Sequence, residues 1–317
     1  DLHSFPTRRS SDLHIAARSL SHGIYVQDQI KWNKWSLLLG LRKEFFTDKY
    51  NFEKVSEEDV RQESLIPRVG LVYSLTRNIN LYATWVEGFM PQATASMTNP
   101  NAGGPFSPLV SRMYEAGAKG DFLRGRLSAS VAVYQLEQNN VLVNANNPSN
   151  PDSLMQRGQD RGRGVEFDVN GRVTDELFIS ANYAYSKTII AKSTIKEQEG
   201  RLKENAPLHQ GGVWIKYQVG EGSLKGIGIG AGSNFVSKRR TFSEILELPG
   251  YMVMDAALYY KFEKVQLSVN LNNIFDKTHW VGGYDFNRLY PGAPRNFLAT
   301  ISIWRSEERR VGKECRS

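Results

Sequence analysis

Apolar and polar residues alternate along most of the chain, and the alternation is clearest between residues 248 and 280. From residue 265 to residue 272 every apolar residue is followed by a polar one. This period of two predicts a strand with one apolar face. Residues 253–262 alternate in the same way, and only Glu263 and Lys264 remain to join the two strands. The segment is therefore expected to form a hairpin with a two-residue turn.

The same pattern recurs from residue 15 to residue 304 and predicts a chain built of strands. In the first of them Asp28 shares a face with Val26 and Ile30, so the register of that strand stays open. The predicted strands are 23–30, 35–42, 67–74, 80–87, 114–122, 126–135, 165–170, 177–185, 213–217, 227–232, 253–262, 265–272 and 297–303.

Short turns alternate with long polar segments along this series. The predicted long loops are 47–63, 90–108, 139–160, 190–206 and 276–294. Tight turns on one side and long loops on the other are typical of antiparallel outer-membrane barrels, whereas sandwiches and propellers more often have turns of similar length. Aromatic residues also gather at the two ends of the hairpin 253–272, as in the interfacial girdles of such barrels. We therefore predict an all-β, antiparallel transmembrane β-barrel of the outer membrane.

Composition agrees with this class without requiring it. The hydrophobic content is 40% and the mean hydropathy is −0.43, and no apolar run approaches the roughly 20 residues of a spanning helix. The net charge is +7 and the pI about 9.3, but the basic residues are scattered singly through strands and loops. No nucleic-acid partner is predicted.

The two ends differ from the rest in period and in residue types. We interpret residues 1–14 and 305–317 as non-native flanks, with disordered native termini as the alternative, and residues 15–304 as one barrel portion. The single cysteine, Cys315, lies in the second flank. No signal peptide is recognisable, so the start of an exported protein is expected to be missing.

Catalytic and metal-binding motifs are absent from the sequence. It has no G-x-S-x-G, P-loop, H-E-x-x-H or C-x-x-C pattern, and its histidines are isolated. Glu166 and Asp168 share a strand face, but charge facing a lumen beside Arg161 and Arg163 explains them better than acid–base catalysis. We predict that the protein is not an enzyme and that it has no cofactor and no metal site of its own.

Large aromatic residues gather instead in segments predicted to be loops. Exposed rings beside a cation suit an amphipathic, anionic ligand through stacking and charge. The alternative is an interfacial girdle or loops that pack on one another. For Trp280 and Tyr290, which flank strands, ligand binding and a place in the girdle are weighed equally. For Tyr284 and Phe286, ligand binding or loop closure is favoured over a place in the girdle. The candidate ligand-binding residues are Trp280, Tyr284, Phe286, Arg288 and Tyr290 in one loop, and Phe89, with Met90 beside it, and Phe106 in another.

From about residue 23 to residue 304 the chain resembles the C-terminal barrel portion of TonB-dependent siderophore receptors, with the ferrichrome-like branch nearest. The resemblance rests on the order and spacing of several stretches, each of them loose alone. They are GIYVQDQIKW, LGLRKEFF, PRVGLVY, NLYATWVEGFMPQ, YEAGAKGDF, DRGRGVEFDVNGRVTDELFISANYAY, NAPLHQGGVWIKY, LPGYMVMDAALYYKF, VNLNNIFDKTHW and PGAPRNFLATISIW.

The resemblance implies a barrel of about 22 strands around an N-terminal plug, in the outer membrane of a Gram-negative bacterium. A ferric siderophore would be the transported ligand, and the TonB complex, acting through the plug, would supply energy. The implied partners are thus the siderophore, TonB and outer-membrane lipid. Two departures indicate a fragment: the plug and first strands are missing, and Arg305 follows Trp304 where the family ends on an aromatic residue.

Four alternatives remain open at this point. A passive porin would have a similar wall, but it should carry constriction-loop charge and should lack the stretches NNIFDKTHW and APRNFLAT. An outer-membrane hydrolase would need a nucleophile and its base, and a soluble β-rich binding module would partition into buffer without detergent. A receptor for another TonB-dependent cargo, such as cobalamin, would share the whole wall, because loops diverge fastest.

Overall fold

The computed structural model describes residues 15–52, 56–99, 101–145, 147–150, 152–193, 195–243 and 245–303. The flanks predicted at 1–14 and 305–317 lie outside these residues, as does Trp304.

The described chain is almost entirely β-structure, which confirms the all-β class. Its long strands are β1 (Ile15–Trp32), β2 (Trp35–Phe52), β3 (Ser56–Ser74), β4 (Ile79–Met90), β5 (Leu109–Phe122), β6 (Leu127–Asn144), β7 (Leu154–Arg172), β8 (Leu177–Lys192), β9 (His209–Gln218), β10 (Ile227–Val236), β13 (Tyr251–Phe262), β14 (Val265–Asn272) and β17 (Asn296–Ile303). The short elements are α1 (Thr94–Thr98), η1 (Lys196–Gln198), β11 (Arg239–Arg240), β12 (Glu247–Leu248), β15 (Trp280–Asp285) and β16 (Arg288–Pro291). Neither helix of the described residues is long and apolar enough to cross a membrane.

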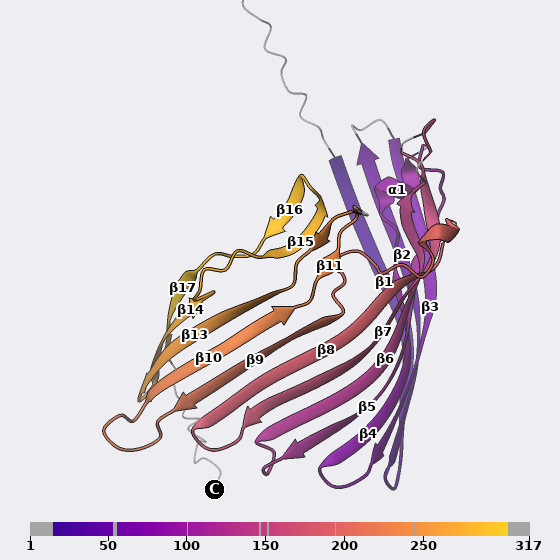
Figure 1. Cartoon of the computed structure of the whole chain (residues 1–317). Helices are drawn as coiled ribbons and strands as arrows, with labels where there is room; N and C mark the ends of the chain where they lie inside the picture. The colour runs from indigo at the N-terminus through magenta and orange to yellow at the C-terminus, as the bar shows by residue number, and fades with distance from the viewer. Residues whose placement is uncertain are drawn as a thin grey trace, which may run out of the picture. The chain divides into compact units, whose positions relative to one another are not determined.

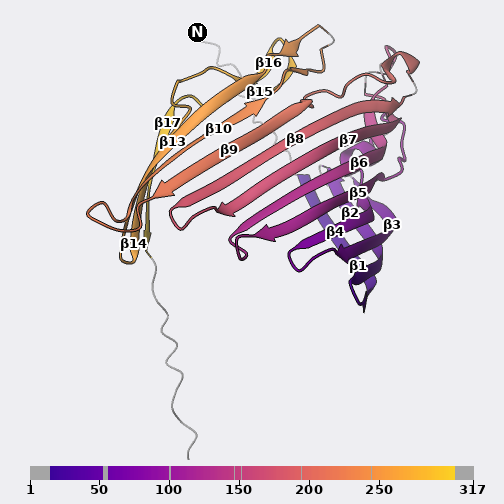
Figure 2. The ribbon, with the colours of Figure 1, turned by 60° about the horizontal axis from the view of Figure 1, so that its bottom comes forward.

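The long strands hydrogen bond in one sheet in the order β1-β2-β3-β4-β5-β6-β7-β8-β9-β10-β13-β14-β17, while β11 pairs with β12 and β15 with β16. The chain divides into two units, which we describe separately. Unit 1 comprises residues 1–118, 133–163 and 188–203, and unit 2 comprises residues 119–132, 164–187 and 204–317. In both views β1 to β4 of unit 1 run side by side (Figure 1, Figure 2), as do β9, β10 and β13 of unit 2.

The short turns lie where the sequence predicts them. β1 and β2 are joined by residues 33–34, with Asn33 at φ +52°, and β13 and β14 by residues 263–264, with Glu263 at φ +46°. Two-residue hairpin turns use this left-handed region because its twist matches the twist of the strands. The hairpin predicted between residues 253 and 272 is confirmed.

The loop predicted at 47–63 is wrong, because β2 continues to Phe52 and β3 begins at Ser56. In this part of the ladder charged residues face one another across the two strands. Lys43 Nζ lies 2.8 Å from a Glu63 carboxylate oxygen, and Lys49 Nζ lies 3.5 Å from Asp59. With polar residues on both faces the apolar period disappears, yet the backbone N–H and C=O groups still pair with the neighbouring strand.

The other four predicted loops also contain regular structure: α1 lies within 90–108, and η1 with the end of β8 lies within 190–206. The segment 139–160 is shortened at both ends, because β6 extends to Asn144 and β7 begins at Leu154. The segment 276–294 contains the hairpin of β15 and β16. That hairpin has two register shifts, so its side chains do not follow a period of two.

The apolar faces of the strands are exposed in each unit rather than packed under a second layer. In unit 1 the side chain of Ile24 is 75% exposed, and in unit 2 that of Leu258 is 63% exposed. A protein surrounded by water rarely exposes large apolar patches, whereas a lipid-facing wall does so throughout. Direct pairing of Asp28 with Leu39 also resolves the register of β1 and places this carboxylate on the apolar face.

A cluster of rings lies at the loop end of the apolar face in unit 2. Tyr183 and Phe235 stand on either side of Gly211 in neighbouring strands, and their centroids are 6.3 Å apart. The hydroxyl of Tyr183 also lies 2.9 Å from Nδ1 of His209. A Cβ at Gly211 would come within 2.9 Å of the Phe235 ring, so the glycine makes room for it. Such a ring cluster is typical of the interfacial girdle of an outer-membrane wall.

Candidate ligand-binding hairpin

The β15–β16 hairpin of unit 2 carries five of the predicted site residues. Its turn is residues 286–287, where the backbone N–H of Asn287 donates to Oδ1 of Asp285 at 2.9 Å. This is the local Asx geometry that aspartate favours in turns. The turn thereby holds Asp285, Phe286 and Arg288 in a defined arrangement.

Asn205 clamps the middle of this hairpin from a segment 78 residues earlier in the sequence. Its Nδ2 donates to the carbonyl oxygen of Gly283 at 2.9 Å, and its Oδ1 accepts the N–H of Gly283 at 3.0 Å. The side-chain amide thus takes the place of a neighbouring strand. Gly283 is buried, and a Cβ there would lie 2.8 Å from Cδ2 of Leu289. Only glycine allows this close approach.

The segment 239–248 supports the base of the hairpin. Thr241 is fully buried, and its hydroxyl donates to the carbonyl oxygen of Leu246 at 3.0 Å. Arg239 is also buried, donates from Nη2 to the carbonyl oxygen of Trp280, and lies 5.7 Å from the centre of the Tyr251 ring. The hairpin is therefore fixed to the sheet by hydrogen bonds of buried polar side chains, which are costly to break.

Tyr284 is the centre of an exposed aromatic cluster. Its ring stacks on Phe242 with centroids 4.4 Å apart and planes 22° apart. The guanidinium carbon of Arg288 lies 3.9 Å from the centre of the same ring. Tyr284 is 42% and Phe242 is 53% exposed. Flat rings with a cation against them form a surface on which a planar ligand can stack.

The charge of Arg288 is shared with Asp285. Nε and Nη2 of Arg288 both donate to Oδ2 of Asp285, Nε at 3.0 Å. The Arg288 guanidinium, followed by the Asn287 N–H, holds the pKa of Asp285 below its usual range, and Asp285 in turn raises the pKa of Arg288. The cation is therefore largely balanced, and stacking on Tyr284 is its main contribution to the surface.

We expect the hairpin to keep its conformation in mild acid. Because the pKa of Asp285 is lowered in the folded state, its stabilising effect is present above the ordinary value of about 3.9 and is lost only as pH falls through the lower folded pKa. A fluorotyrosine placed at position 284 should therefore show a ¹⁹F shift that changes below about pH 3.9. In Arg288→Gln the midpoint should move upward, and equal midpoints in the two proteins would contradict the assigned cause.

The other predicted residues of this hairpin are held less tightly. Trp280 is half-buried and begins the hairpin opposite Pro291. Phe286, at the turn, and Tyr290 are both more than half exposed. Tyr290 lies across from Gly282. The structure brings together Tyr284 and Arg288, and it leaves Phe286 and Tyr290 exposed on the same hairpin.

The second predicted group lies in unit 1, at the end of β4 and in the loop after α1. Phe89 and Phe106 are half-buried, and no ring contact joins them in the described part of the chain. Gln92 organises this region: it exchanges two hydrogen bonds with Gln62 and donates to the carbonyl oxygens of Ser107 and Asn140. These bonds order the loop that carries Phe106. A ligand-binding role for Phe89 and Phe106 stays a prediction.

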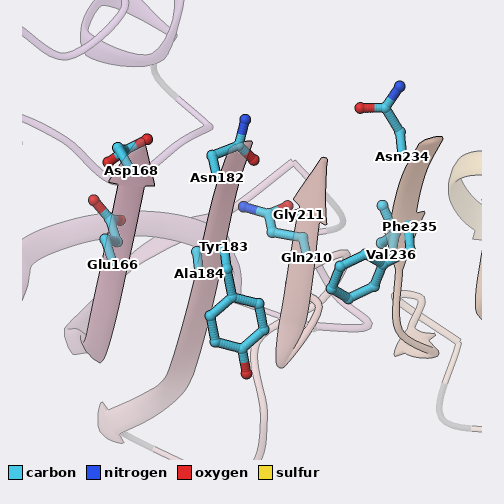
Figure 3. A pocket seen from close by; sticks show the side chains of 10 residues that line it. All are labelled: Glu166, Asp168, Asn182, Tyr183, Ala184, Gln210, Gly211, Asn234, Phe235 and Val236. Atoms are coloured by element: carbon cyan, nitrogen blue, oxygen red, sulfur yellow. The ribbon is translucent and has the colours of Figure 1, made fainter. Parts of the chain in front are cut away.

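Glu166 and Asp168 line a shallow hollow of about 270 Å³ in unit 2 (Figure 3). Its other polar side chains are the amides of Asn182, Gln210 and Asn234 and the phenol of Tyr183. Figure 3 shows Asn182 and Tyr183 pointing in opposite directions from one strand, as the alternation requires. Neither a histidine nor a lysine is among the described residues that line the hollow.

Sequence reasoning did not identify Phe242, Asn205 or Arg239 as parts of the site. Phe242 lies in a stretch without periodicity, so nothing indicated that its ring would meet Tyr284. Asn205 belongs to the stretch NAPLHQGGVWIKY, which carries part of the resemblance, but its contact with Gly283 is set by tertiary structure. Its φ of +56° is one that asparagine adopts more readily than most residues.

Comparison with known sequences agrees with the predicted outer-membrane barrel. Residues 4–274 match the family described as TonB dependent receptor-like, beta-barrel. The chain is 32% identical over 289 residues to the metal-pseudopaline receptor CntO of Pseudomonas aeruginosa, a match that covers 88% of this chain and 40% of CntO. It is 27% identical over 290 residues to the ferrioxamine B receptor of Salmonella typhimurium, with the same two coverages. The chain thus spans about 40% of the length of these relatives.

Solved structures share the fold. The siderophore receptor PiuA from Acinetobacter baumannii superposes with a TM-score of 0.79 at 23% identity, over 91% of this chain and 44% of PiuA. The ferripyoverdine receptor of the outer membrane of Pseudomonas aeruginosa gives 0.76 at 22% identity, over 91% of this chain and 39% of the receptor. The extent of the family match decides the assignment. The chain belongs to the TonB-dependent receptor-like β-barrel family and is part of an outer-membrane protein of Gram-negative bacteria.

Proposed function

We propose that the chain is the barrel portion of a receptor that binds a metal chelate of the siderophore or metallophore class and imports it with energy from the TonB complex. The observation that carries the proposal is the exposed stack of Phe242 on Tyr284, with Arg288 against the same Tyr284 ring, in a chain of this family. Stacking surfaces of this kind suit amphipathic ligands with planar groups. The ligand would be cargo, and the reaction is transport without chemical change.

The relatives support the class of cargo and leave the individual compound open. Those named above are receptors for metal-pseudopaline, ferrioxamine B and ferripyoverdine. The narrower placement in a ferrichrome-like branch stays a prediction, because none of these relatives is a ferrichrome receptor. The TonB complex would act through the remainder of a full-length protein, as the length of the relatives suggests. Cobalamin or another cargo stays the alternative within the same family.

A passive porin is less well supported. The family match joins the chain to receptors, and the hairpin presents a stacking surface where a pore would need only charge and width. A soluble module is disfavoured by the exposed apolar faces. The family is one of receptors and transporters rather than enzymes, in agreement with the predicted absence of catalysis.

Tyr284→Ala tests the proposal in the full-length receptor. Loss of the ring removes the stacking surface together with the support of Phe242 and Arg288, so uptake of the cognate metal chelate should fall by about tenfold, as for loss of one well-placed aromatic contact. Uptake of radiolabelled chelate by cells, normalised to receptor at the surface, measures this.

Tyr217→Ala provides the matched control. Tyr217 is exposed to a similar extent, at 47%, but lies on the apolar face of β9, so uptake per receptor should be unchanged.

Tyr290→Ala separates the two roles predicted for that residue: reduced uptake indicates ligand contact, and reduced membrane insertion indicates a girdle role. Normal uptake in Tyr284→Ala would reject the site.

A further inference from the structure

Three aromatic rings border the apolar face of unit 1 at its turn end. Trp32 and Trp35 lie directly opposite each other in the β1–β2 hairpin, and Tyr73 of β3 lies opposite Trp35. Residues directly opposite each other share a face of the sheet, and the next pair on this face is Ile30 with Leu37. The ring centroids of Trp35 and Tyr73 are 4.5 Å apart, and Trp32 is 75% exposed. The rings therefore lie where the exposed apolar wall ends.

Lys34 connects this border to the neighbouring turn. Its Nζ lies 6.0 Å from the centre of the Tyr73 ring and donates to the carbonyl oxygen of Leu75 at 3.4 Å. The carbonyl oxygen of Lys34 accepts the N–H of Ser74 at 2.8 Å. The ammonium group is thus placed beside a ring of the apolar face, and its partners there are uncharged.

Arg77 adds a second cation in the turn between β3 and β4. Oγ1 of Thr76 accepts the N–H groups of Asn78 and Ile79 at 3.2 Å and 3.0 Å, which fixes the backbone on either side of Arg77. The Arg77 side chain is exposed, and within the part of the chain that the structure describes it forms neither a hydrogen bond nor an ion pair. Its guanidinium group is therefore available to a ligand.

The adjoining sequence supplies no carboxylate to balance these cations. Residues 29–43 and 64–86 contain neither aspartate nor glutamate. Asp28 shares the apolar face, but it lies four residues along β1 from Trp32, about 13 Å at the rise of a strand. The border therefore combines rings, an apolar wall and an excess of positive charge.

We propose that this border binds the head group of an anionic phospholipid. Short turns of outer-membrane barrels lie on the periplasmic side, so the rings and cations meet the phospholipid head groups of that leaflet. Tryptophan and tyrosine rings sit at this level of a membrane, and a nearby lysine or arginine is attracted to lipid phosphate. The acyl chains would lie along the apolar wall. The head-group site consists of Trp32, Lys34, Trp35, Tyr73 and Arg77.

The charges of the head-group site also set which phospholipid it prefers. Phosphatidylethanolamine has an ammonium group beside its phosphate, and the cations of Lys34 and Arg77 would repel that group. Phosphatidylglycerol has the phosphate without an ammonium group. A free anion would gain nothing from the rings or from the apolar wall. The site faces lipid rather than cargo, so it is independent of the proposed transport function.

Native mass spectrometry of the full-length receptor in a nonionic detergent tests the head-group site. Phosphatidylglycerol and phosphatidylethanolamine with the same acyl chains are added in turn, and wild type should retain more phosphatidylglycerol. Lys34→Gln and Arg77→Gln should each lower its retention about fivefold, the contribution of one cation near an anionic lipid surface. Trp35→Ala should lower retention of both lipids, because contact with the ring does not depend on head-group charge.

Lys31→Gln is the matched control. Lys31 is exposed and lies three residues before Lys34, but it pairs with Ser36 on the polar face, so retention of phosphatidylglycerol should be unchanged. Excess inorganic phosphate should not displace the lipid. Equal retention of the two lipids by wild type overturns the site, and so does displacement by inorganic phosphate. Retention in Lys34→Gln and Arg77→Gln that equals retention in Lys31→Gln overturns it as well.

Discussion

Replacing Gly171 by alanine is expected to prevent stable folding of the strands around it. Gly171 has φ +144°, and a Cβ built there would overlap the carbonyl oxygen of Arg126 and lie 2.7 Å from the Cα of Leu127. The obstructing atoms are backbone, and the N–H of Arg172 donates to the same carbonyl at 2.7 Å, so the strand cannot move aside without losing a ladder bond. Strain and overlap together should cost roughly 3 to 5 kcal/mol.

Gly125→Ala is the matched control for this substitution. Gly125 also has a positive φ, +81°, but a Cβ there meets no atom within 4 Å. Its cost is limited to backbone strain of about 1 kcal/mol. Heat-modifiable migration in SDS gels and the urea midpoint of the full-length receptor in detergent measure both variants. Equal midpoints for the two would show that the overlap at Gly171 relaxes freely.

The second large effect is expected from Asn205→Gly, which should detach the β15–β16 hairpin without unfolding the sheet. Glycine tolerates the φ of +56° at this position, so the substitution removes only the side chain and its two bonds to Gly283. A buried N–H and C=O left without partners cost about 1 to 3 kcal/mol each. Chelate uptake should fall at least about tenfold, and trypsin should cleave faster after Arg288.

Asn205→Asp refines this test because it retains one of the two bonds. Its carboxylate can still accept the N–H of Gly283, but it cannot donate to the carbonyl oxygen, so the effect should be intermediate. Surface abundance of the receptor should match wild type in both variants. Cleavage at the wild-type rate in Asn205→Gly would show that the hairpin is held by other contacts, such as that between Arg239 and Trp280.

Strands could be predicted from the sequence where apolar and polar residues alternate, and were missed where they do not. The strands 253–262 and 265–272 agree closely with β13 and β14, because one face of each is apolar and the other polar. The segment 47–63 was mistaken for a loop because β2 and β3 continue there with charges on both faces. Backbone hydrogen bonding does not need the apolar period that sequence reading relies on.

The candidate site was predictable in composition but not in arrangement. Tyr284 and Arg288 were identified as a ring and a cation in one loop, and the structure places one over the other. The stack with Phe242 and the clamp by Asn205 join segments far apart in sequence. The pairing of Arg288 with Asp285 lies only three residues apart, so local charge patterning could have indicated it.

The charged ladder of β2 and β3 has one further consequence. Lys49 and Asp59 lie directly opposite each other on adjacent strands, and their sheet pairing is made by backbone atoms alone. Exchanging the two side chains together should therefore leave the wall intact while inverting the local charge pattern. The charge pattern of this part of the wall can therefore vary in evolution while the strand pairing beneath it stays the same.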